Sequence, residues 1–447
     1  MIDFSKASLE TLLAKDGFDC ACGRHHSMVM DYLSIRSGAV KDIPQAFEVM
    51  GKKRPFIVCD KNTKAAAWDK VQPVLDEAGI EYVLFCLPME HVEPNEEAMG
   101  SLIMGFDPSC DCVMGIGSGV VNDCSKLLAY MTGRKMINVG TAPSMDGYAS
   151  NCSAMIREGA KCTIANEAPA ALIGDIDIIK AAPMRMLRAG LGDMLAKYIA
   201  LCEWRITNLI NDEYYCPNVA GLMRASLEKI VKHAPALYKR DPDAVQATVE
   251  GLVLSGVAMS FAGNSRPASG LEHYFSHLWE MMALERGIPF DLHGNQVGVG
   301  TIKTLKLYDI IRTLKPDLEK AMAFRRDFNE EKWESELRRI FGKTAETVIT
   351  LEKTSFHNND AAEHAVRAAK IVEHWDEILT IIDEELPNVQ EIETLMKGLD
   401  MAMEPEGVGF TRQDAVDAFR ASRDTRKKYL TSSMLWDMGV LYEIELP

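Results

Sequence analysis

The sequence lacks a long apolar run and an excess of positive charge, and each absence excludes a class of protein. The longest uncharged stretch, residues 251–263, falls short of the ~20 residues that span a bilayer, so it predicts a buried helix. The first residues show no basic start followed by an apolar run, so we expect no signal peptide. Forty-nine basic and 65 acidic residues give a net charge of −16, which disfavours nucleic acid and anionic membranes as partners.

Cysteine is present, but not as a disulfide framework. The eleven cysteines are odd in number and scattered over 447 residues, unlike those of a small secreted domain. We therefore expect a reducing cytoplasm. Cys20 and Cys22 precede His25 and His26 in the segment CACGRHH, which is a conceivable zinc knuckle. No second ligand pair completes it in the sequence, so free cysteines in a turn are the favoured interpretation.

Two hydrophobic patterns divide the chain near residues 180–185. Before this point, short β-branched runs alternate with helical stretches, and after it almost every segment is helical. The pattern predicts an α/β protein with a Rossmann-like parallel-sheet domain over residues 1–184 and an all-helical domain over residues 185–447. The predicted strands are 55–60, 81–86, 111–117, 135–141 and 171–179, with a hairpin at 153–157 and 161–165.

A glycine-rich loop, GIGSGVVND at 115–123, lies between a predicted strand and a predicted helix. Its glycines would let backbone N–H groups approach a pyrophosphate at the amino terminus of the helix. An ordinary tight turn remains an alternative, because the loop departs from the usual G-x-G-x-x-G. Asp60 ends the first predicted strand and is a candidate acceptor for a ribose hydroxyl, which would disfavour NADP. A helix cap is the other interpretation of Asp60.

A second loop, TAPSMDGYAS at 141–150, also follows a predicted strand. Thr141, Ser144 and Ser150 would donate hydrogen bonds to phosphate or nicotinamide, and Asp146 offers a carboxylate nearby. Turn-forming composition alone would also explain this segment.

One carboxylate and three histidines form the most specific pattern. Asp193 lies in GLGDMLAK, His273 and His277 share one helix face in SGLEHYFSH, and His293 follows in DLHGNQ. A carboxylate with two or three imidazoles suits Zn²⁺ or another first-row cation and leaves a position open for substrate. Arg266, seven residues before His273, suits a substrate phosphate or carboxylate, or else a structural ion pair.

With these segments assembled, the sequence resembles the iron-containing alcohol dehydrogenase and glycerol dehydrogenase superfamily, and within it the sn-glycerol-1-phosphate dehydrogenases. The similar segments run in order over about residues 55–310: GSGVVND, TAPSMDGYAS, GLGDMLAKY, SRPASGLEHYFSHLWE and HGNQVGVGT. The resemblance implies the dehydroquinate synthase-like fold, a homodimer, and interconversion of dihydroxyacetone phosphate and sn-glycerol 1-phosphate by hydride transfer. The alternative is another substrate of the same superfamily, glycerol or a different polyol or alcohol.

The resemblance also implies a metal centre. It assigns one divalent ion to Asp193, His273 and His293. Imidazole and carboxylate ligands accept Zn²⁺, Ni²⁺ or Fe²⁺, and we expect Zn²⁺ or Ni²⁺ ahead of Fe²⁺. Because three protein ligands already suffice for an open catalytic site, His277 is predicted to touch substrate or relay its proton. The alternative for His277 is packing against Trp279.

The remaining site residues serve substrate and cofactor. The resemblance places substrate near Asp146, Asp193 and His277, and Arg266 would hold its phosphate. NAD is the expected cofactor, with NADP as a second one. The residues expected to bind it are Asp60, Gly117, Ser118, Gly119, Val120, Val121, Thr141, Ala142, Pro143, Ser144 and Ser150.

Overall fold

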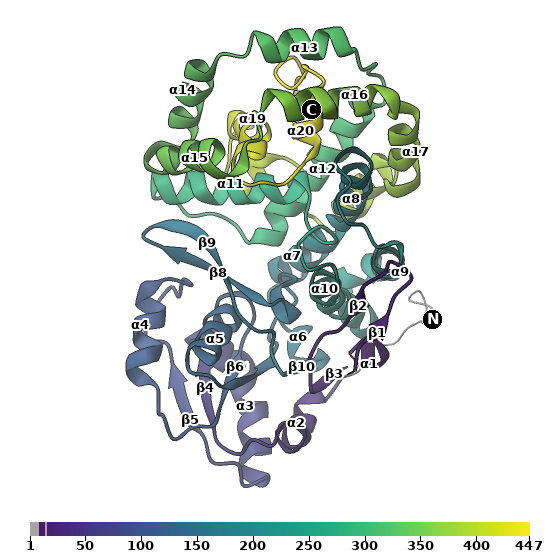
Figure 1. The fold of residues 1–447 in the computed structure, drawn as a ribbon. Coiled ribbons are helices and arrows are strands. Elements are labelled where there is room, and N and C mark those ends of the chain that lie inside the picture. The colour runs from purple at the N-terminus through teal and green to yellow at the C-terminus, as the bar shows by residue number, and fades with distance from the viewer. Residues whose placement is uncertain (1–8, 14–15) are drawn as a thin grey trace. The chain divides into compact units, whose positions relative to one another are not determined.

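Six parallel strands form the central sheet of the computed structural model, which describes residues 9–13 and 16–447 (Figure 1). Their order across the sheet is β3-β10-β7-β6-β4-β5, and every neighbouring pair is parallel. The strands are β3 (Tyr32–Arg36), β4 (Pro55–Cys59), β5 (Val83–Cys86), β6 (Cys112–Ile116), β7 (Lys135–Val139) and β10 (Ala171–Asp175). The predicted α/β fold is confirmed, and the edge strand β3 is an element that the sequence pattern missed.

Helices cover both faces of this sheet. Successive side chains of a strand point to opposite faces, and those on both faces are buried under helices. Ile57, Met114 and Ile137 belong to the core under α2 (Ile43–Met50) and α3 (Lys61–Glu77). The intervening residues, Phe56, Val113 and Met136, belong to the core under α4 (Glu96–Gly105) and α5 (Gly119–Met131). Burial on both faces explains why β4 (PFIVC) and β6 (CVMGI) are apolar runs in the sequence.

The last strand is shorter than predicted because Asp175 ends it. Its buried carboxylate accepts hydrogen bonds from the backbone N–H groups of Gly38 at 3.1 Å, Val40 at 3.0 Å and Asp177 at 2.9 Å. The last of these caps a short helix, α6 (Ile176–Ile179). The predicted hairpin is present as the antiparallel pair β8 (Cys152–Arg157) and β9 (Ala160–Ala165).

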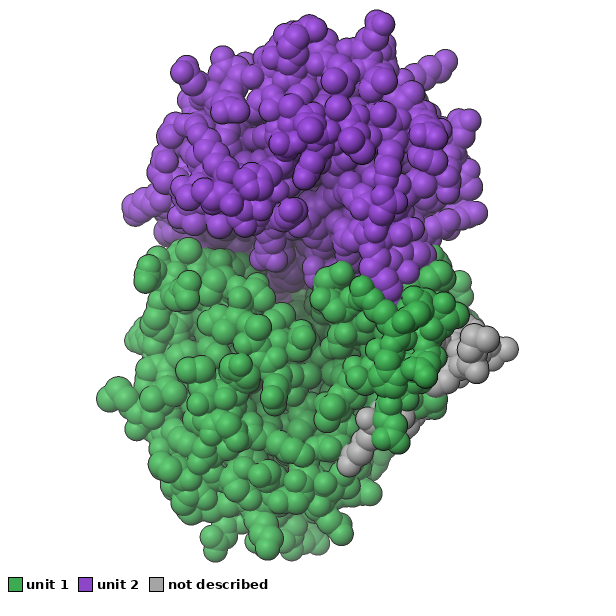
Figure 2. Space-filling view, viewed as in Figure 1, with its two compact units in different colours: residues 1–194, 216–264 green, residues 195–215, 265–447 purple. Residues whose placement is uncertain are grey.

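The chain divides into two compact units, shown in different colours in Figure 2. Unit 1 comprises residues 1–194 and 216–264, and unit 2 comprises residues 195–215 and 265–447. Three helices that the sequence pattern assigned to the helical half therefore lie mostly or wholly with the sheet in unit 1. They are α7 (Met184–Leu195), α9 (Pro217–His233) and α10 (Pro242–Ala262).

Helix α10 contains the long uncharged stretch of the sequence. Among the described residues it is the one helix long and apolar enough to cross a membrane by length and composition. Within the structure, 72% of its most apolar window is buried. A Cβ on Gly251 would lie 2.3 Å from the Ile230 side chain of α9, so glycine permits close packing of the two helices. Helix α10 therefore has the burial of a core helix.

Unit 2 is helical throughout. Its helices are α8 (Lys197–Asn211), α11 (Leu271–Arg286), α12 (His293–Ile311), α13 (Leu318–Arg326), α14 (Glu330–Phe341), α15 (Ala345–Leu351), α16 (Ala361–Glu373), α17 (Trp375–Glu385), α18 (Val389–Gly398), α19 (Arg412–Ala421) and α20 (Thr431–Asp437). Helix α11 packs against α12 and α19, and its fully buried Trp279 ring stacks on Phe410 at 5.3 Å. This packing gives the histidines of α11 a rigid support.

Candidate active site

The predicted cofactor residues follow three neighbouring strands of unit 1. Strand β6 lies between β4 and β7, with Gly115 in register with Val58 on one side and Asn138 on the other. Asp60, Gly117 and Thr141 come just after these three strands. They therefore share the carboxyl edge of the sheet, where ligands of parallel α/β folds bind.

The glycine-rich loop has the geometry of an anion-binding turn. A Cβ on Gly117 would lie 2.5 Å from the Cβ of Val121, so only glycine fits there without displacement. Gly119 has φ +45° and begins α5, and the preceding Ser118 side chain makes no capping hydrogen bond. The first N–H groups of α5 thus lack a side-chain cap, and this end of the helix suits a pyrophosphate.

Asp60 caps a helix, which is one of the two roles that the sequence suggested for it. Its Oδ1 accepts hydrogen bonds from the backbone N–H groups of Asn62 and Thr63, both at 2.7 Å, at the start of α3. Both bonds use one carboxylate oxygen, and the side chain is only partly buried. Capping therefore leaves the second oxygen for a ribose hydroxyl.

The loop at 141–150 is held by a buried lysine that sequence reasoning missed. Lys126 of α5 is 1% exposed and donates to the Gly147 carbonyl and the Ser150 hydroxyl, each at 3.0 Å. Its ammonium also pairs with Asp123 at 3.0 Å. Ser144 lies 3.5 Å from Ser118, oxygen to oxygen, which joins this loop to the glycine-rich loop. The available sequence signal was a lysine placed three residues after Asp123 in the helix that follows the glycine-rich loop.

The loop contacts α7 and α10 through Asp146. The backbone N–H of Asp146 donates to Asp193 Oδ2 at 3.0 Å, and Ser255 of α10 donates to Asp146 Oδ2 at 2.8 Å. Asp193 is fully buried. A Cβ on Gly190 would lie 1.9 Å from the Pro143 carbonyl oxygen, so the loop rests directly on α7. Ser255 is a further residue that the sequence did not indicate.

The predicted histidine ligands lie together in unit 2. The rings of His273 and His293 are 5.4 Å apart, centroid to centroid. His273 Nδ1 lies 2.8 Å from Glu272 Oε1, and His293 Nδ1 lies 2.8 Å from the Ser276 hydroxyl. With Nδ1 hydrogen-bonded, each ring presents Nε2 for coordination, which is the arrangement found around metal-bound histidines. The side chains therefore fit a divalent cation.

Glu272 is a buried partner that the sequence did not single out. Its side chain is 0% exposed. The carboxyl groups of Glu272 and Glu203 both lie next to Gly270, because a Cβ added to this glycine would be 2.8 Å from an oxygen of each. Burial first, and then the Glu203 carboxylate, raise the pKa of Glu272 to about 8. Burial also lowers the pKa of nearby Lys428 to about 7. The signal available in the sequence was an acidic residue next to a predicted ligand in a mostly apolar helix.

His277 belongs to the same cluster. Its ring stacks on His293 at 5.5 Å and lies 6.2 Å from the ring of His273. His277, Glu280 and His293 also bring potential ligand atoms within 4.8 Å of one another. His277 is thus one turn beyond His273 on α11 and beside both predicted imidazole ligands.

Arg266 forms a structural ion pair, which is one of the two roles that the sequence suggested for it. Its guanidinium donates to both carboxylate oxygens of Glu213, at 2.7 and 2.6 Å, and to the Tyr429 carbonyl at 2.6 Å. The side chain is buried at 3% exposure. Such a bidentate pair fixes the SRPASG segment within unit 2.

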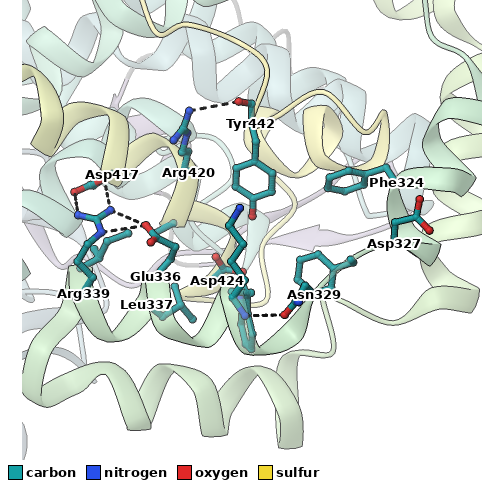
Figure 3. A pocket seen from close by; sticks show the side chains of 15 residues that line it. Phe324, Asp327, Asn329, Glu336, Leu337, Arg339, Asp417, Arg420, Asp424 and Tyr442 are labelled. Atoms are coloured by element: carbon teal, nitrogen blue, oxygen red, sulfur yellow. Dashed lines mark hydrogen bonds and ion pairs between the residues drawn. The ribbon is translucent and has the colours of Figure 1, made fainter.

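A separate pocket of about 590 Å³ lies in unit 2 among α13, α14 and α19 (Figure 3). Phe324 and Leu337 give it an apolar wall, while the Arg339 guanidinium is paired with Asp417 and Glu336. It contains none of the predicted site residues. Its wall also contains other acidic and basic side chains, so the pocket carries charges of both signs.

Comparison with known proteins relates this architecture to one family. The model of the iron-containing alcohol dehydrogenase family matches residues 34–183. A glycerol-1-phosphate dehydrogenase [NAD(P)+] of Halalkalibacterium halodurans is 35% identical over 295 residues, which cover 65% of this chain and 74% of that protein. The corresponding protein of Bacillus licheniformis is 31% identical over 364 residues, covering 79% and 88% of the two chains.

Solved structures support the same fold. Glycerol dehydrogenase from Schizosaccharomyces pombe superposes with a TM-score of 0.58 at 15% identity, covering 94% of this chain and 91% of that one. Sulfoacetaldehyde reductase from Bifidobacterium kashiwanohense, solved with NAD+, gives a TM-score of 0.59 at 14% identity and covers 94% and 99%. The chain belongs to the iron-containing alcohol dehydrogenases and, among them, to the glycerol-1-phosphate dehydrogenase family.

Proposed function

We propose that this chain is an NAD(P)-dependent, metal-dependent oxidoreductase that interconverts dihydroxyacetone phosphate and sn-glycerol 1-phosphate. The observation that carries the proposal is the pair of imidazoles at His273 and His293. Both Nδ1 atoms are hydrogen-bonded, and both residues lie in segments that resemble the glycerol-1-phosphate dehydrogenases. The similarity to proteins of that name supports the choice of substrate over an unphosphorylated alcohol.

Asp193, His273 and His293 are the proposed metal ligands. The donor set of one carboxylate and two imidazoles suits Zn²⁺ or Ni²⁺ and leaves coordination positions for substrate. Burial of Asp193 and His273 supports this role, because a buried carboxylate gains most from a cation. Glu272 and Ser276 would orient the two rings.

The proposed cofactor site follows β4, β6 and β7. The N–H groups at the start of α5 would hold the pyrophosphate, and Asp60 would accept a hydrogen bond from the adenosine ribose. Donors of the loop at 141–150, held in shape by Lys126, would position the nicotinamide. The Asp60 carboxylate favours NAD over NADP, because a 2′-phosphate would meet a like charge.

The reduction needs a hydride, positive charge beside the ketone oxygen, and a proton. When bound, NAD(P)H supplies the hydride and the divalent ion supplies the positive charge. The protein must then deliver a proton to the alkoxide oxygen. Asp146, held by Ser255, and His277 are the proposed residues for this transfer, directly or through water.

Substrate specificity provides the direct test of this proposal. NADH oxidation by the metal-loaded protein should be fast with dihydroxyacetone phosphate and slow with dihydroxyacetone or glyceraldehyde. Equal rates with and without the phosphate group would favour the alternative of a glycerol or polyol dehydrogenase.

Arg266 has two roles to separate, phosphate binding and the ion pair with Glu213. If it binds phosphate, Arg266→Lys should raise KM for dihydroxyacetone phosphate while leaving the thermal midpoint near that of the parent protein. If it acts through Glu213, Glu213→Gln should reproduce the kinetic defect of Arg266→Lys, and both variants should melt at a lower temperature.

We also propose that the protein is cytoplasmic and, as the family resemblance implies, a homodimer. The described part of the chain contains no disulfide, which fits a reducing compartment. Sedimentation of the purified protein tests the dimer, and a monomer at assay concentration would contradict it.

A further inference from the structure

A small hairpin of unit 1 brings two cysteines and a histidine to one end. Its strands are β1 (Phe18–Asp19) and β2 (His25–His26), and the turn between them is closed by a hydrogen bond from Cys20 N–H to the Arg24 carbonyl at 3.0 Å. Gly23 has φ +83°, a conformation that a side chain would strain. The turn therefore presents Cys20, Cys22 and His26 together.

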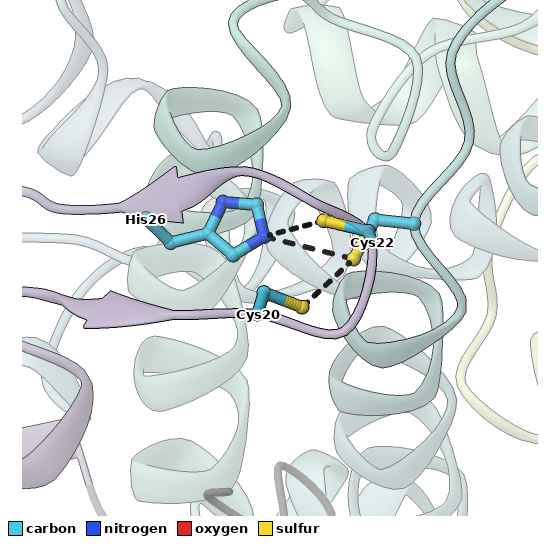
Figure 4. A group of neighbouring side chains, drawn as sticks. Cys20, Cys22 and His26 are labelled. Carbon is cyan, nitrogen blue, oxygen red and sulfur yellow. Dashed lines mark hydrogen bonds between the residues drawn. The ribbon is translucent and has the colours of Figure 1, made fainter.

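A third cysteine from a distant part of the sequence completes the group. Cys216 precedes α9 and is also in unit 1. Its Sγ lies 3.7 Å from Cys20 Sγ and 3.6 Å from His26 Nε2, and Cys22 Sγ lies 3.4 Å from the same Nε2. Figure 4 shows the His26 ring directed at this sulfur cluster. All four ligand atoms lie within 4.8 Å of one another.

These separations match the edges of a zinc tetrahedron. With Zn–S bonds of about 2.3 Å and a Zn–N bond of about 2.0 Å, tetrahedral geometry requires S···S edges of about 3.8 Å and S···N edges of about 3.5 Å. The three separations given above fall close to these values. A disulfide between Cys20 and Cys216 is not formed, because its sulfurs would be about 2.05 Å apart.

Further hydrogen bonds orient the ligands. His26 Nδ1 lies 3.1 Å from the Phe261 carbonyl oxygen, so this nitrogen carries the proton and Nε2 presents its lone pair. The side-chain amide of Asn218 donates to Cys20 Sγ at 3.1 Å, and the backbone N–H of Val219 donates to Cys216 Sγ at 3.5 Å. These hydrogen bonds hold the two sulfurs in position beside the His26 ring.

We infer that Cys20, Cys22, His26 and Cys216 bind a structural Zn²⁺ ion, separate in ligand chemistry from the proposed catalytic metal. Four protein ligands close the coordination sphere, so this ion has no position for substrate. Cys20 and Cys22, which the sequence predicted to be free cysteines in a turn, would be ligands of this site together with Cys216. A second pair of neighbouring ligands is not needed, because the fourth ligand is a single cysteine, 190 positions after His26.

The site would fasten the hairpin to the helices of unit 1. Cys216 is at the start of α9, and the hairpin reaches the end of α10 through His26 to Phe261 and through Arg24 to the Ala262 carbonyl at 3.1 Å. A short two-stranded hairpin is at best marginally stable by itself. A metal ion shared with α9 would hold it in place, as zinc does in other small elements.

Zinc X-ray absorption on the untagged full-length protein tests the inference directly. We expect sulfur scatterers at about 2.3 Å, because the proposed catalytic ligands supply only nitrogen and oxygen. Zinc bound solely by nitrogen and oxygen, or a protein free of zinc after purification in zinc-containing medium, would overturn the inference. So would a stoichiometric content of iron with its visible absorption, or a disulfide detected by mass spectrometry.

The zinc content of single variants tests whether these four residues bind the ion. Cys216→Ser should lose about one equivalent of zinc per chain, and His26→Ala should do the same. Cys162→Ser, a partly buried cysteine of β9 outside the cluster, is the matched control and should keep the full content. Unchanged zinc in Cys216→Ser would contradict the assignment. If the variants do not fold, the absorption spectrum of the parent protein still decides.

Discussion

His26 stands among three cysteine sulfurs in unit 1, whereas His273 and His293 of unit 2 have carboxyl and hydroxyl partners. The thiolate-rich set uses all four positions of a tetrahedron and suits an ion that stays in place. The imidazoles, with the Asp193 carboxylate proposed as their third partner, leave room for a substrate oxygen. Ligand type and ligand number, rather than the presence of histidine, therefore separate the proposed structural metal site from the proposed catalytic one.

The largest expected effect on activity comes from a substitution at the proposed catalytic metal site. His273→Ala should lower kcat/KM by about 10³-fold or more, because the charge that stabilises the alkoxide is worth several kcal/mol. Metal analysis should show loss of the catalytic ion while circular dichroism stays unchanged. His374→Ala, which alters a partly exposed histidine of the same unit, is the control and should remain active. Normal turnover with full metal content in His273→Ala would refute the ligand assignment.

His277→Ala distinguishes a residue that touches substrate from one that binds metal. If His277 transfers the proton, kcat should fall by about 10²-fold while metal content and NADH affinity stay at the level of the parent protein. A smaller loss would mean that it only positions substrate. Loss of metal together with activity would make it a ligand, and unchanged kinetics would leave it a packing residue.

Asp60 is proposed to determine the preference for NADH over NADPH. Asp60→Asn keeps a side chain that caps α3 but removes the charge, so the preference for NADH over NADPH should narrow by roughly tenfold to a hundredfold, or about 1–3 kcal/mol. Asp241→Asn, at the equivalent capping position of α10, is the matched control. Parent protein that uses both cofactors equally would show that Asp60 only caps the helix.

The smallest expected effect concerns a residue that orients a ligand. Ser276→Ala removes the hydroxyl 2.8 Å from His293 Nδ1, while Glu280 Oε1 remains at 3.2 Å. Metal affinity, measured by competition with a chelator, should therefore fall by only about tenfold. Ser432→Ala, another buried serine of unit 2, should leave affinity unchanged. An equal loss in both variants would point to general destabilisation instead.

The two sites also differ in how much of each the sequence could predict. His273 and His277 share a helix face, and the strands that precede Asp60, Gly117 and Thr141 are apolar runs, so local patterns sufficed to propose these residues. Cys216 could not be found in this way, because its partnership with Cys20 arises from tertiary contact across 196 positions. Glu272 and Lys126 were missed because a charged residue is normally expected at the surface, whereas both are buried with specific partners here.

The fold shows the same limit. Alternating strands and helices predicted the parallel sheet, but β3 (YLSIR) is only partly buried and mixes polar with apolar residues, so its sequence gave a weaker signal. The division into compact units depends on which helices pack on the sheet. The sequence pattern could not indicate that α9 and α10 belong to unit 1, because they are as helical as their neighbours in unit 2.

The identity of the product tests the central claim most directly. Dihydroxyacetone phosphate and NADH should react one to one, and the glycerol phosphate formed should resist oxidation by a dehydrogenase specific for sn-glycerol 3-phosphate. That result would establish hydride delivery to the ketone face that yields sn-glycerol 1-phosphate. Complete oxidation of the product by that enzyme, or no reaction with the phosphorylated ketone, would contradict the account.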